Sequence, residues 1–476
     1  MSATIEVKYF NSFLLRKTVD ANNNDLPAYK PATTTTAKNW IIEESRIKGR
    51  FNGTSVGFGP RAYLVSENNS GSIRFNSLIY SGIFNSRTSI NETNVFPVGE
   101  DISRSLDPQN GSIQKLYAEN TNLTILQEDK VSRALIDKDA IYSAEGSAIT
   151  TSGAMVIGQI VPYAGEYGIS KDPGSFAVYG FRKYFTDRRR SAVLRLSQDG
   201  ITEISSYGMR DFFRDELNNL DSGTNQIGVI KGGWDTHSKS YVTSFQPWEF
   251  TPTNDSNYKT LAFDEGPKGW VSFYNYKPSQ IFSLKNNFYT TNGNKIHRHY
   301  AGNYGEFYGV SQPSTVTLIF NPQASLSKNF KTINYEGTSG WKVNSIVSDA
   351  TEFDTVSGTP TAFNDSALPI ASYEEGQYIL FNNSVIITPS DPAFFSLTTS
   401  AGYFIQRYGF DRKENKYTSA IKNNSQPRSN EVIHGSSISG IKGYLATVQL
   451  STDATTSPTE KKELFAVSSN YVESSY

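Results

Sequence analysis

Three short segments of this chain repeat one pattern: an aromatic residue followed by Asp, five further residues, and a second aromatic residue that opens a strand-like run. They are Trp234-Asp235 to Tyr241 (GWDTHSKSYVTSF), Phe263-Asp264 to Trp270 (AFDEGPKGWVSFY) and Phe410-Asp411 to Tyr417 (GFDRKENKYTSA). An Asp at the start of a polar loop can accept a hydrogen bond from the backbone two residues later, and the flanking aromatics can meet across two strands. Each copy therefore predicts a β-hairpin, and repeated hairpins predict a body built from sheets or propeller blades.

The composition also favours β-structure and limits the available chemistry. The 476 residues include 28 Tyr and 29 Phe, which fit pleated, half-buried surfaces, but only three Met. Because the chain has no cysteine, disulfides, thiolate metal sites and cysteine nucleophiles are excluded. The 45 basic and 46 acidic residues give a net charge of −1, so the chain as a whole has no electrostatic attraction for nucleic acid or anionic lipid.

The start of the chain, MSATIEVKYFNSFLLRK, does not have the apolar stretch and small-residue cleavage site of a secretory signal. No stretch approaches the ~20 apolar residues that span a bilayer. We therefore expect a soluble protein that is made inside a cell and does not contact a membrane.

Strand and turn signals divide the chain into an N-terminal arm and β region at residues 1–112, a β-propeller-like core at residues 113–312 and a C-terminal β-rich region at residues 313–476. Within the core, the pair Asp199-Gly200 separates two alternating strands, which is a strong hairpin signal. We expect a mainly β fold: a β-propeller-like or multi-sheet body with one or two short amphipathic helices and a C-terminal β domain.

One segment, SSYGMRDFFRDELNNL, has the pattern of an amphipathic helix. Most of its apolar groups fall on one face, which comprises Met209, Phe212, Phe213, Glu216, Leu217 and Leu220. Asp211 lies near the positive end of the helix dipole. We expect this helix to pack between sheet modules.

Several motifs resemble parts of enzyme sites, but each has a simpler explanation. Residues 53–57 (GTSVG) match the sequence pattern G-x-S-x-G of a nucleophile elbow. Residues 58–60 (FGP), however, are a poor start for the helix that must follow this motif. Residues 197–202 resemble the Asp box of sialidase-type propellers, but Asp199 and Gly200 are adjacent, so a hairpin turn explains them. Among 46 acidic residues we cannot nominate a carboxylate pair for glycoside hydrolysis. We therefore predict no catalytic residues and a protein that is not an enzyme.

Metal and cofactor sites are also not expected. His297 and His299 lie two residues apart in an expected strand and could share a metal, but no third ligand is identifiable. Residues 20–24 imitate the start of a calcium loop, but Asp25 replaces the Gly of that loop and Pro31 occupies the position of its Glu.

The run Arg188-Arg189-Arg190 is the main basic feature, with Arg182 and Lys183 close by. It could contact nucleic acid or an acidic subunit. Because Asp187 is adjacent and the run falls between two expected strands, a solvated loop tip is the favoured interpretation.

The order of the elements expected between Ile113 and Tyr276 resembles that of a known protein family. A strand pair (LTILQEDKVSRALI) is followed by a Gly-containing segment at residues 160–170, a hairpin at residues 193–204, the helix MRDFFRDEL, and the hairpins GWDTHSKSYV and FDEGPKGWVSFY. This order resembles that of the tail hub, or packaged-DNA-stabilising (nozzle-like), structural proteins of short-tailed bacteriophages. The segments NYEGTSGW and ELFAVSSNYVESSY are also similar to uncharacterised virion proteins of marine phages.

The resemblance implies a propeller-like body in the virion tail that assembles as a ring, commonly a hexamer, beneath the portal and adaptor. Such a ring closes the DNA exit channel, carries fibres or spikes, and lets genomic DNA pass without sequence recognition. It brings no catalytic residues. This chain departs from the family upstream of Ile113, where no blades can be marked out. Two alternatives stay open: a baseplate or fibre-connector protein, and a glycan-binding or glycan-cleaving β-propeller, because exposed Trp and Tyr stack well on sugars.

Overall fold

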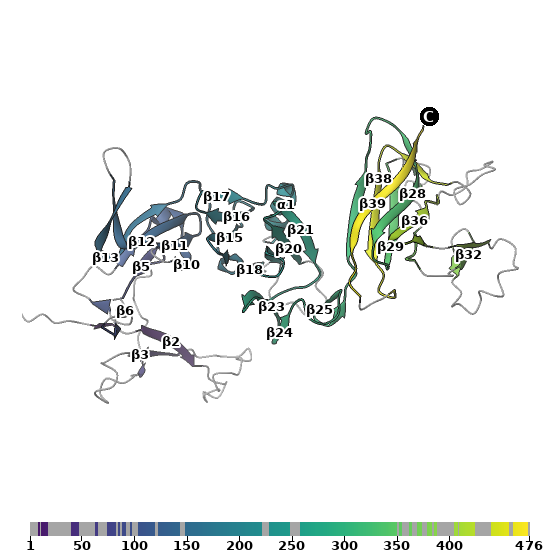
Figure 1. Cartoon of the computed structure of the whole chain (residues 1–476). Helices are drawn as coiled ribbons and strands as arrows, with labels where there is room; N and C mark the ends of the chain where they lie inside the picture. The colour runs from purple at the N-terminus through teal and green to yellow at the C-terminus, as the bar shows by residue number, and fades with distance from the viewer. Residues whose placement is uncertain are drawn as a thin grey trace, which may run out of the picture. The chain divides into compact units, whose positions relative to one another are not determined.

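The computed structural model describes residues 74–81, 88–89, 103–119, 122–136, 156–220, 228–247, 258–349, 369–373, 409–423, 439–456 and 460–474, together with the backbone of some further strands. The chain divides into two compact units, Met1–His297 and Arg298–Tyr476. In the described part, the regular structure is β-sheet apart from one α-helix and short 3-10 turns (Figure 1). This confirms the expected mainly β, multi-sheet fold.

The centre of the N-terminal unit is a succession of antiparallel sheets in which strands that follow one another in sequence are hydrogen-bonded neighbours. The first sheet contains β10 (Ile113–Glu119), β11 (Asn122–Gln127), β12 (Val131–Tyr142) and β13 (Ala148–Pro162). The second contains β14 (Ala177–Tyr179), β15 (Arg182–Asp187), β16 (Ala192–Ser197) and β17 (Gly200–Glu203). The third contains β18 (Val229–Asp235), β19 (Ser240–Gln246), β20 (Lys259–Asp264) and β21 (Gly269–Tyr274). A smaller sheet follows with β22 (Gln280–Leu284), β23 (Asn287–Asn292) and β24 (Lys295–Arg298).

Short strands form small sheets upstream of these. β1 (Lys8–Tyr9) pairs with β8 (Phe96–Pro97), β5 (Ser77–Ile79) with β9 (Ser103–Ser105), and β6 (Phe84–Asn85) with β7 (Ile90–Asn91). β2 (Asn11–Lys17), β3 (Trp40–Arg46) and β4 (Ala62–Leu64) form a three-stranded sheet. None of the described sheets closes into a barrel.

The large sheets follow one another in chain order (Figure 1), and neighbouring sheets share hydrophobic cores. The first and second sheets pack through a cluster that includes Val131 and Phe185. The second and third pack through one that includes Tyr184 and Phe245, and the third and fourth meet around Phe288. Because side chains alternate between the faces of a strand, neighbouring residues such as Tyr184 and Phe185 enter different cores.

The expected helix is present as α1 (Arg210–Asn219) and lies in the core between the second and third sheets. Phe213 and Leu217 are buried, as is Leu220 just after the helix. The Phe213 ring packs on Trp270, with 4.5 Å between ring centroids. This position agrees with the expectation that the helix packs between sheet modules.

The first two aromatic-Asp repeats form adjacent hairpins of the third sheet. Trp234 pairs with Tyr241, Tyr241 with Phe263, and Phe263 with Trp270, so that one row of aromatic residues crosses four strands. The Oδ1 atom of Asp235 accepts a hydrogen bond from the His237 backbone N–H at 2.8 Å. The expected aromatic pairing and Asp-capped loops are therefore confirmed in both copies, the second with Asp264 as acceptor for Gly266 at 2.8 Å.

The third repeat is also a hairpin, formed by β35 (Asp411–Lys413) and β36 (Lys416–Ala420), but the expected aromatic pairing is wrong here. Tyr417 lies opposite Arg412, because the turn contains two residues instead of four and Glu414 adopts a φ of 58°. Phe410 instead packs edge-on against Tyr335, with 4.8 Å between ring centroids.

The C-terminal unit is built from two sheets on one core. One sheet has the order β27 (Thr315–Phe320), β38 (Ala446–Thr452), β29 (Trp341–Ser348). In the other, β28 (Lys328–Gly337) pairs with β36 and β37 (Ile441–Gly443), and also with β39 (Leu464–Glu473). Residues such as Ile333 of β28 and Ile346 and Leu450 of the facing sheet are fully buried between them.

Small sheets complete the described strands of this unit. β25 (Glu306–Phe307) pairs with β26 (Val310–Ser311), and β30 (Glu352–Asp354) pairs with β31 (Thr361–Phe363). β32 (Tyr378–Asn382) lies between β33 (Val385–Ile387) and β34 (Phe404–Arg407).

Asp453 fixes the segment at residues 369–373 beside the end of β38. Its carboxylate accepts hydrogen bonds from the Ser372 hydroxyl at 2.6 Å and from the backbone and hydroxyl of Thr455 at 2.9 and 2.7 Å. Burial alone would raise the pKa of Asp453, but the hydrogen bonds from Ser372, Thr455 and Thr456 outweigh it and lower the pKa to about 2.

We expect Phe263→Ala to lower the free energy of unfolding of the N-terminal unit by about 3–5 kcal/mol, because the ring is fully buried and its removal leaves a cavity. Phe273→Ala, the same change at a 57% exposed position of the same sheet, should cost about 1 kcal/mol or less. Urea unfolding followed by Trp fluorescence measures both, and equal costs would contradict the assignment of the core.

Because the pKa of Asp453 lies below its ordinary value of 3.8, the ionised carboxylate stabilises the fold above that pH, and this stabilisation is lost as the pH falls from about 4 towards 2. Asp453→Asn should flatten the acid dependence of the melting temperature in this range. Glu460→Gln, at an exposed carboxylate of the same unit, should retain the wild-type slope. A wild-type slope in Asp453→Asn would refute the assignment.

Candidate functional site

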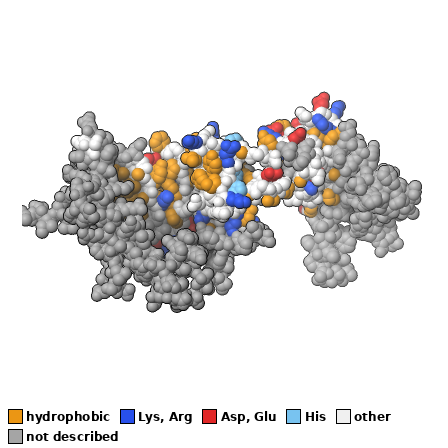
Figure 2. Space-filling model, turned by 90° about the horizontal axis from the view of Figure 1, so that it is seen from below, with side chains coloured by type: hydrophobic (Ala, Val, Ile, Leu, Met, Phe, Trp, Pro, Cys, Tyr) orange, Lys and Arg blue, Asp and Glu red, His pale blue; other side chains and the backbone are white. Residues whose placement is uncertain are grey.

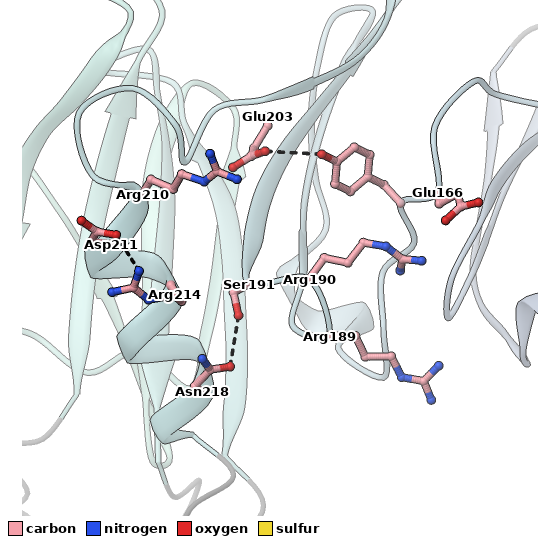
Figure 3. Close-up of a pocket in the computed structure, with 10 residues that line it drawn as sticks. Glu166, Arg189, Arg190, Ser191, Glu203, Arg210, Asp211, Arg214 and Asn218 are labelled. Carbon is pink, nitrogen blue, oxygen red and sulfur yellow. Dashed lines mark hydrogen bonds and ion pairs between the residues drawn. The ribbon is translucent and has the colours of Figure 1, made fainter.

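A polar cavity of about 710 Å³ lies in the N-terminal unit where the loop after β13, the β15–β16 turn, the end of β17 and helix α1 meet (Figure 3). Its walls consist of charged and polar side chains and one Tyr: Glu166, Tyr167, Arg189, Arg190, Ser191, Glu203, Arg210, Asp211, Arg214 and Asn218. Arg190 extends into the space between Glu166 and the Ser191–Asn218 pair (Figure 3). The cavity therefore combines four arginines with three acidic residues.

The run Arg188-Arg189-Arg190 forms the turn between β15 and β16, and all three side chains are in ion pairs. Arg188 contacts Asp172 at 2.5 Å and also donates to the carbonyl of Gly228. The Arg188 side chain is only 11% exposed, so the interpretation as a solvated loop tip is wrong for this residue. The sequence could not reveal this, because the acidic partner is distant in the chain.

Arg189 and Arg190 connect the second sheet to the first. Arg189 contacts Glu128 at 2.8 Å and also pairs with Asp129, which lies in the turn between β11 and β12. Arg190 contacts Asp129 at 3.2 Å and Asp187 at 3.3 Å. These pairs neutralise the arginines with carboxylates of the chain itself, which leaves less charge for an external anion.

Asp187 is the most buried acid of this cluster, with no exposed side-chain surface. Its two carboxylate oxygens accept hydrogen bonds from the Gly168 backbone at 3.0 Å and from the Ser170 hydroxyl at 2.8 Å. A third comes from the Arg190 backbone at 3.2 Å. Asp187 thereby fixes the segment that joins the first sheet to the second.

The surroundings shift the pKa of two groups at or beside the cavity, Tyr167 and Glu128. Burial, with the nearby Glu203 carboxylate, raises the pKa of Tyr167, whose hydroxyl donates to Glu203 at 3.3 Å. Burial opposes ionisation of Glu128, but hydrogen bonds from Ser112 prevail and lower its pKa, so it remains charged opposite Arg189. A Tyr167 that stays neutral and a Glu128 that stays ionised opposite Arg189 do not have the pKa values that suit a general acid or base near neutral pH.

The weak motifs of the sequence do not converge on this cavity. Residues 197–202 form the β16–β17 hairpin, with Gly200 at a φ of 107° after the two-residue turn. His297 lies in β24, whereas His299 contacts the rings of Phe307 and Tyr308. Residues 20–24 and 53–57 lie outside the described residues. Within the described ranges, no group of three His, Asp or Glu residues could hold a metal ion.

On the face shown in Figure 2, charged and hydrophobic side chains of the described residues are interspersed. The described helix, α1, has ten residues and is too short and too polar to cross a bilayer. The described residues on the face in Figure 2 therefore do not form a continuous basic or apolar surface.

Replacing Asp187 with Ala should destabilise the N-terminal unit by about 3–5 kcal/mol, because it leaves the buried donors around it without an acceptor. Asp211→Ala, at a carboxylate that is 83% exposed on the same cavity, should change stability by about 0.5 kcal/mol or less. Chemical denaturation compares the two, and a small effect of Asp187→Ala would contradict its role as an anchor.

Comparison with known proteins gives two sequence matches. A protein family described as Crassvirus muzzle protein C-terminal domain matches residues 302–424. The chain is also 22% identical over 291 residues to the muzzle protein of Bacteroides phage crAss001, a match that covers 56% of this chain and 19% of that protein. The chain therefore spans about a fifth of the length of this curated relative.

Among solved structures, sucrose-6-phosphate hydrolase from Lactobacillus gasseri aligns over 87% of this chain and 88% of that chain, with 10% identity and a TM-score of 0.18. A score this low supports neither a common fold nor a common activity. The relationship that the sequence does support is to muzzle proteins of bacteriophages.

Proposed function

We propose that this chain is a non-enzymatic structural protein of a bacteriophage virion. The observation that carries the proposal is the match of residues 302–424 to the muzzle protein C-terminal domain, together with the longer match to the crAss001 muzzle protein. The earlier resemblance to phage tail proteins rested on different segments, between Ile113 and Tyr276, and pointed to the same class of particle.

The described architecture supports a mechanical role. Successive sheets of the N-terminal unit share cores and are linked by ion pairs such as Lys183 with Glu119, at 2.6 Å, between β15 and β10. Interiors packed in this way have low compressibility and transmit strain. The cavity beside α1 contains a Tyr that stays neutral and arginines that pair with carboxylates, namely Arg189, Arg190 and Arg214, which fits a protein without a reaction centre.

The finer proposal places the protein in the tail, as a hub or nozzle that closes the DNA exit channel. In this role several copies would assemble as a ring, as in the commonly hexameric tail hubs, next to portal or adaptor proteins and fibres or spikes. DNA would pass without sequence recognition, which agrees with a net charge of −1. The proposal includes domain boundaries after residues 112 and 312.

The test is to find the protein in the particle. Mass spectrometry of phage particles purified by density gradient should detect this chain at a fixed ratio to the portal protein, and cryo-EM should place it at the tail. A location in the baseplate or fibre connector would keep the virion role but overturn the hub. Absence from purified particles, or specific binding or cleavage of a glycan by the recombinant chain, would contradict the structural role.

A further inference from the structure

The two lateral sides of the sandwich in the C-terminal unit are built differently. The segment at residues 369–373 hydrogen-bonds to Val343 of β29 and to Phe410 beside β35, so these two edges lie on the same side. β27 and β39 form the opposite edges of their sheets. An unprotected edge strand presents free backbone donors and acceptors to another chain, and proteins block such edges with charges, bulges, short strands or covering segments.

The side formed by β29 and β35 is protected. The backbone of Val343 in β29 exchanges two hydrogen bonds with Ile370, at 2.8 and 3.0 Å, so a further segment covers that edge. The other edge strand, β35, is only three residues long, and its residues Asp411, Arg412 and Lys413 are all charged and exposed.

Among the described residues, the side formed by β27 and β39 does not have these devices along most of its length. The ten-residue strand β39 carries no charge from Leu464 to Val472, and β27 carries none at all. Among the described strands, β39 pairs with β28 and β27 pairs with β38, each along one edge. Register shifts interrupt the pairing of β39 near Phe465 and between Asn470 and Tyr471, but the pairing from Ala466 to Asn470 is regular.

Within the described residues, the core is also less completely covered on this side. Apolar residues of β28, β29 and β38 that face the core are 0–6% exposed. Those of β27 and β39 are only partly buried: Val316, Leu318, Phe320, Leu464, Val467 and Tyr471. The edge strands β27 and β39 therefore pack against the same core, on the side where its apolar residues are only partly buried.

We propose that a second copy of this chain covers this side, with β27 pairing with β27 of the other copy and β39 pairing with its β39. A two-fold axis perpendicular to the sheets makes both pairs antiparallel and extends both sheets across the interface at once. A single foreign strand could complete one edge, whereas a second copy supplies two strands at the matching separation. Self-pairing also requires neutral strands, because it sets identical residues near each other.

This inference does not depend on the proposed virion role. It predicts that copies associate in pairs through the C-terminal unit, so that any larger assembly contains an even number of copies. The surface is an isologous interface, in which the same patch serves both partners.

The absence of cysteine permits a clean test on the full-length chain, because engineered cysteines are then the only thiols. Ser468 and Asn470 are exposed, lie in the regular part of β39 and are two residues apart on one face. In the double variant S468C/N470C, a two-fold axis near the middle of β39 sets a cysteine of one copy opposite a cysteine of the other. Directly opposite residues are within disulfide distance.

The matched control is T418C/A420C on β36, two strands away from β39 in the same sheet. After mild oxidation, S468C/N470C should yield roughly tenfold more covalent dimer than the control, on non-reducing gels, because its thiols are held at bonding distance. Sedimentation of the wild-type chain should show two copies or an even multiple. Cross-linking no stronger than in the control, or a monomeric wild-type chain, would overturn the proposal.

Discussion

Burial of both faces of each central sheet is the constraint on which the rest of the N-terminal unit depends. Tyr184 and Phe185 are neighbours in β15, both with no exposed surface, yet one belongs to the core shared with the third sheet and the other to the core shared with the first. Because successive side chains point to opposite faces, one strand serves two cores. Loss of a sheet would expose apolar surface on the next, which ties the stability of each sheet to that of its neighbours.

Charged residues connect the same sheets where apolar contact ends. Glu265, in the loop of the second aromatic-Asp hairpin, accepts from the Tyr184 hydroxyl at 2.6 Å and from Arg195 at 2.8 Å. The arginine run performs the corresponding role towards the first sheet, through Glu128 and Asp129. The run Arg188-Arg189-Arg190 therefore stabilises the fold, because its charges pair with carboxylates of the chain itself.

Features that depend on neighbouring residues were predictable from the sequence. Helix α1 and the hairpins around Asp235 and Asp264 follow from apolar spacing and turn chemistry within about a dozen residues. The aromatic pairing predicted for the third repeat was wrong because the aromatic-Asp pattern does not specify the length of the turn. Glu414 adopts a positive φ, and the turn is therefore shorter than in the other two copies. The ion pairs of Arg189 beside the cavity were not predictable, because its partners lie 60 and 61 residues away in the chain.

Native-state hydrogen exchange tests most directly whether the sheets form one cooperative body. Amides of β15, β16, β18 and β19 should exchange with a common opening free energy, because the two sheets share the core around Phe213. They should also lose protection together when Phe213 is truncated. Exchange of the second sheet at an opening free energy well below that of the third would show that the sheets open independently, and would contradict this account.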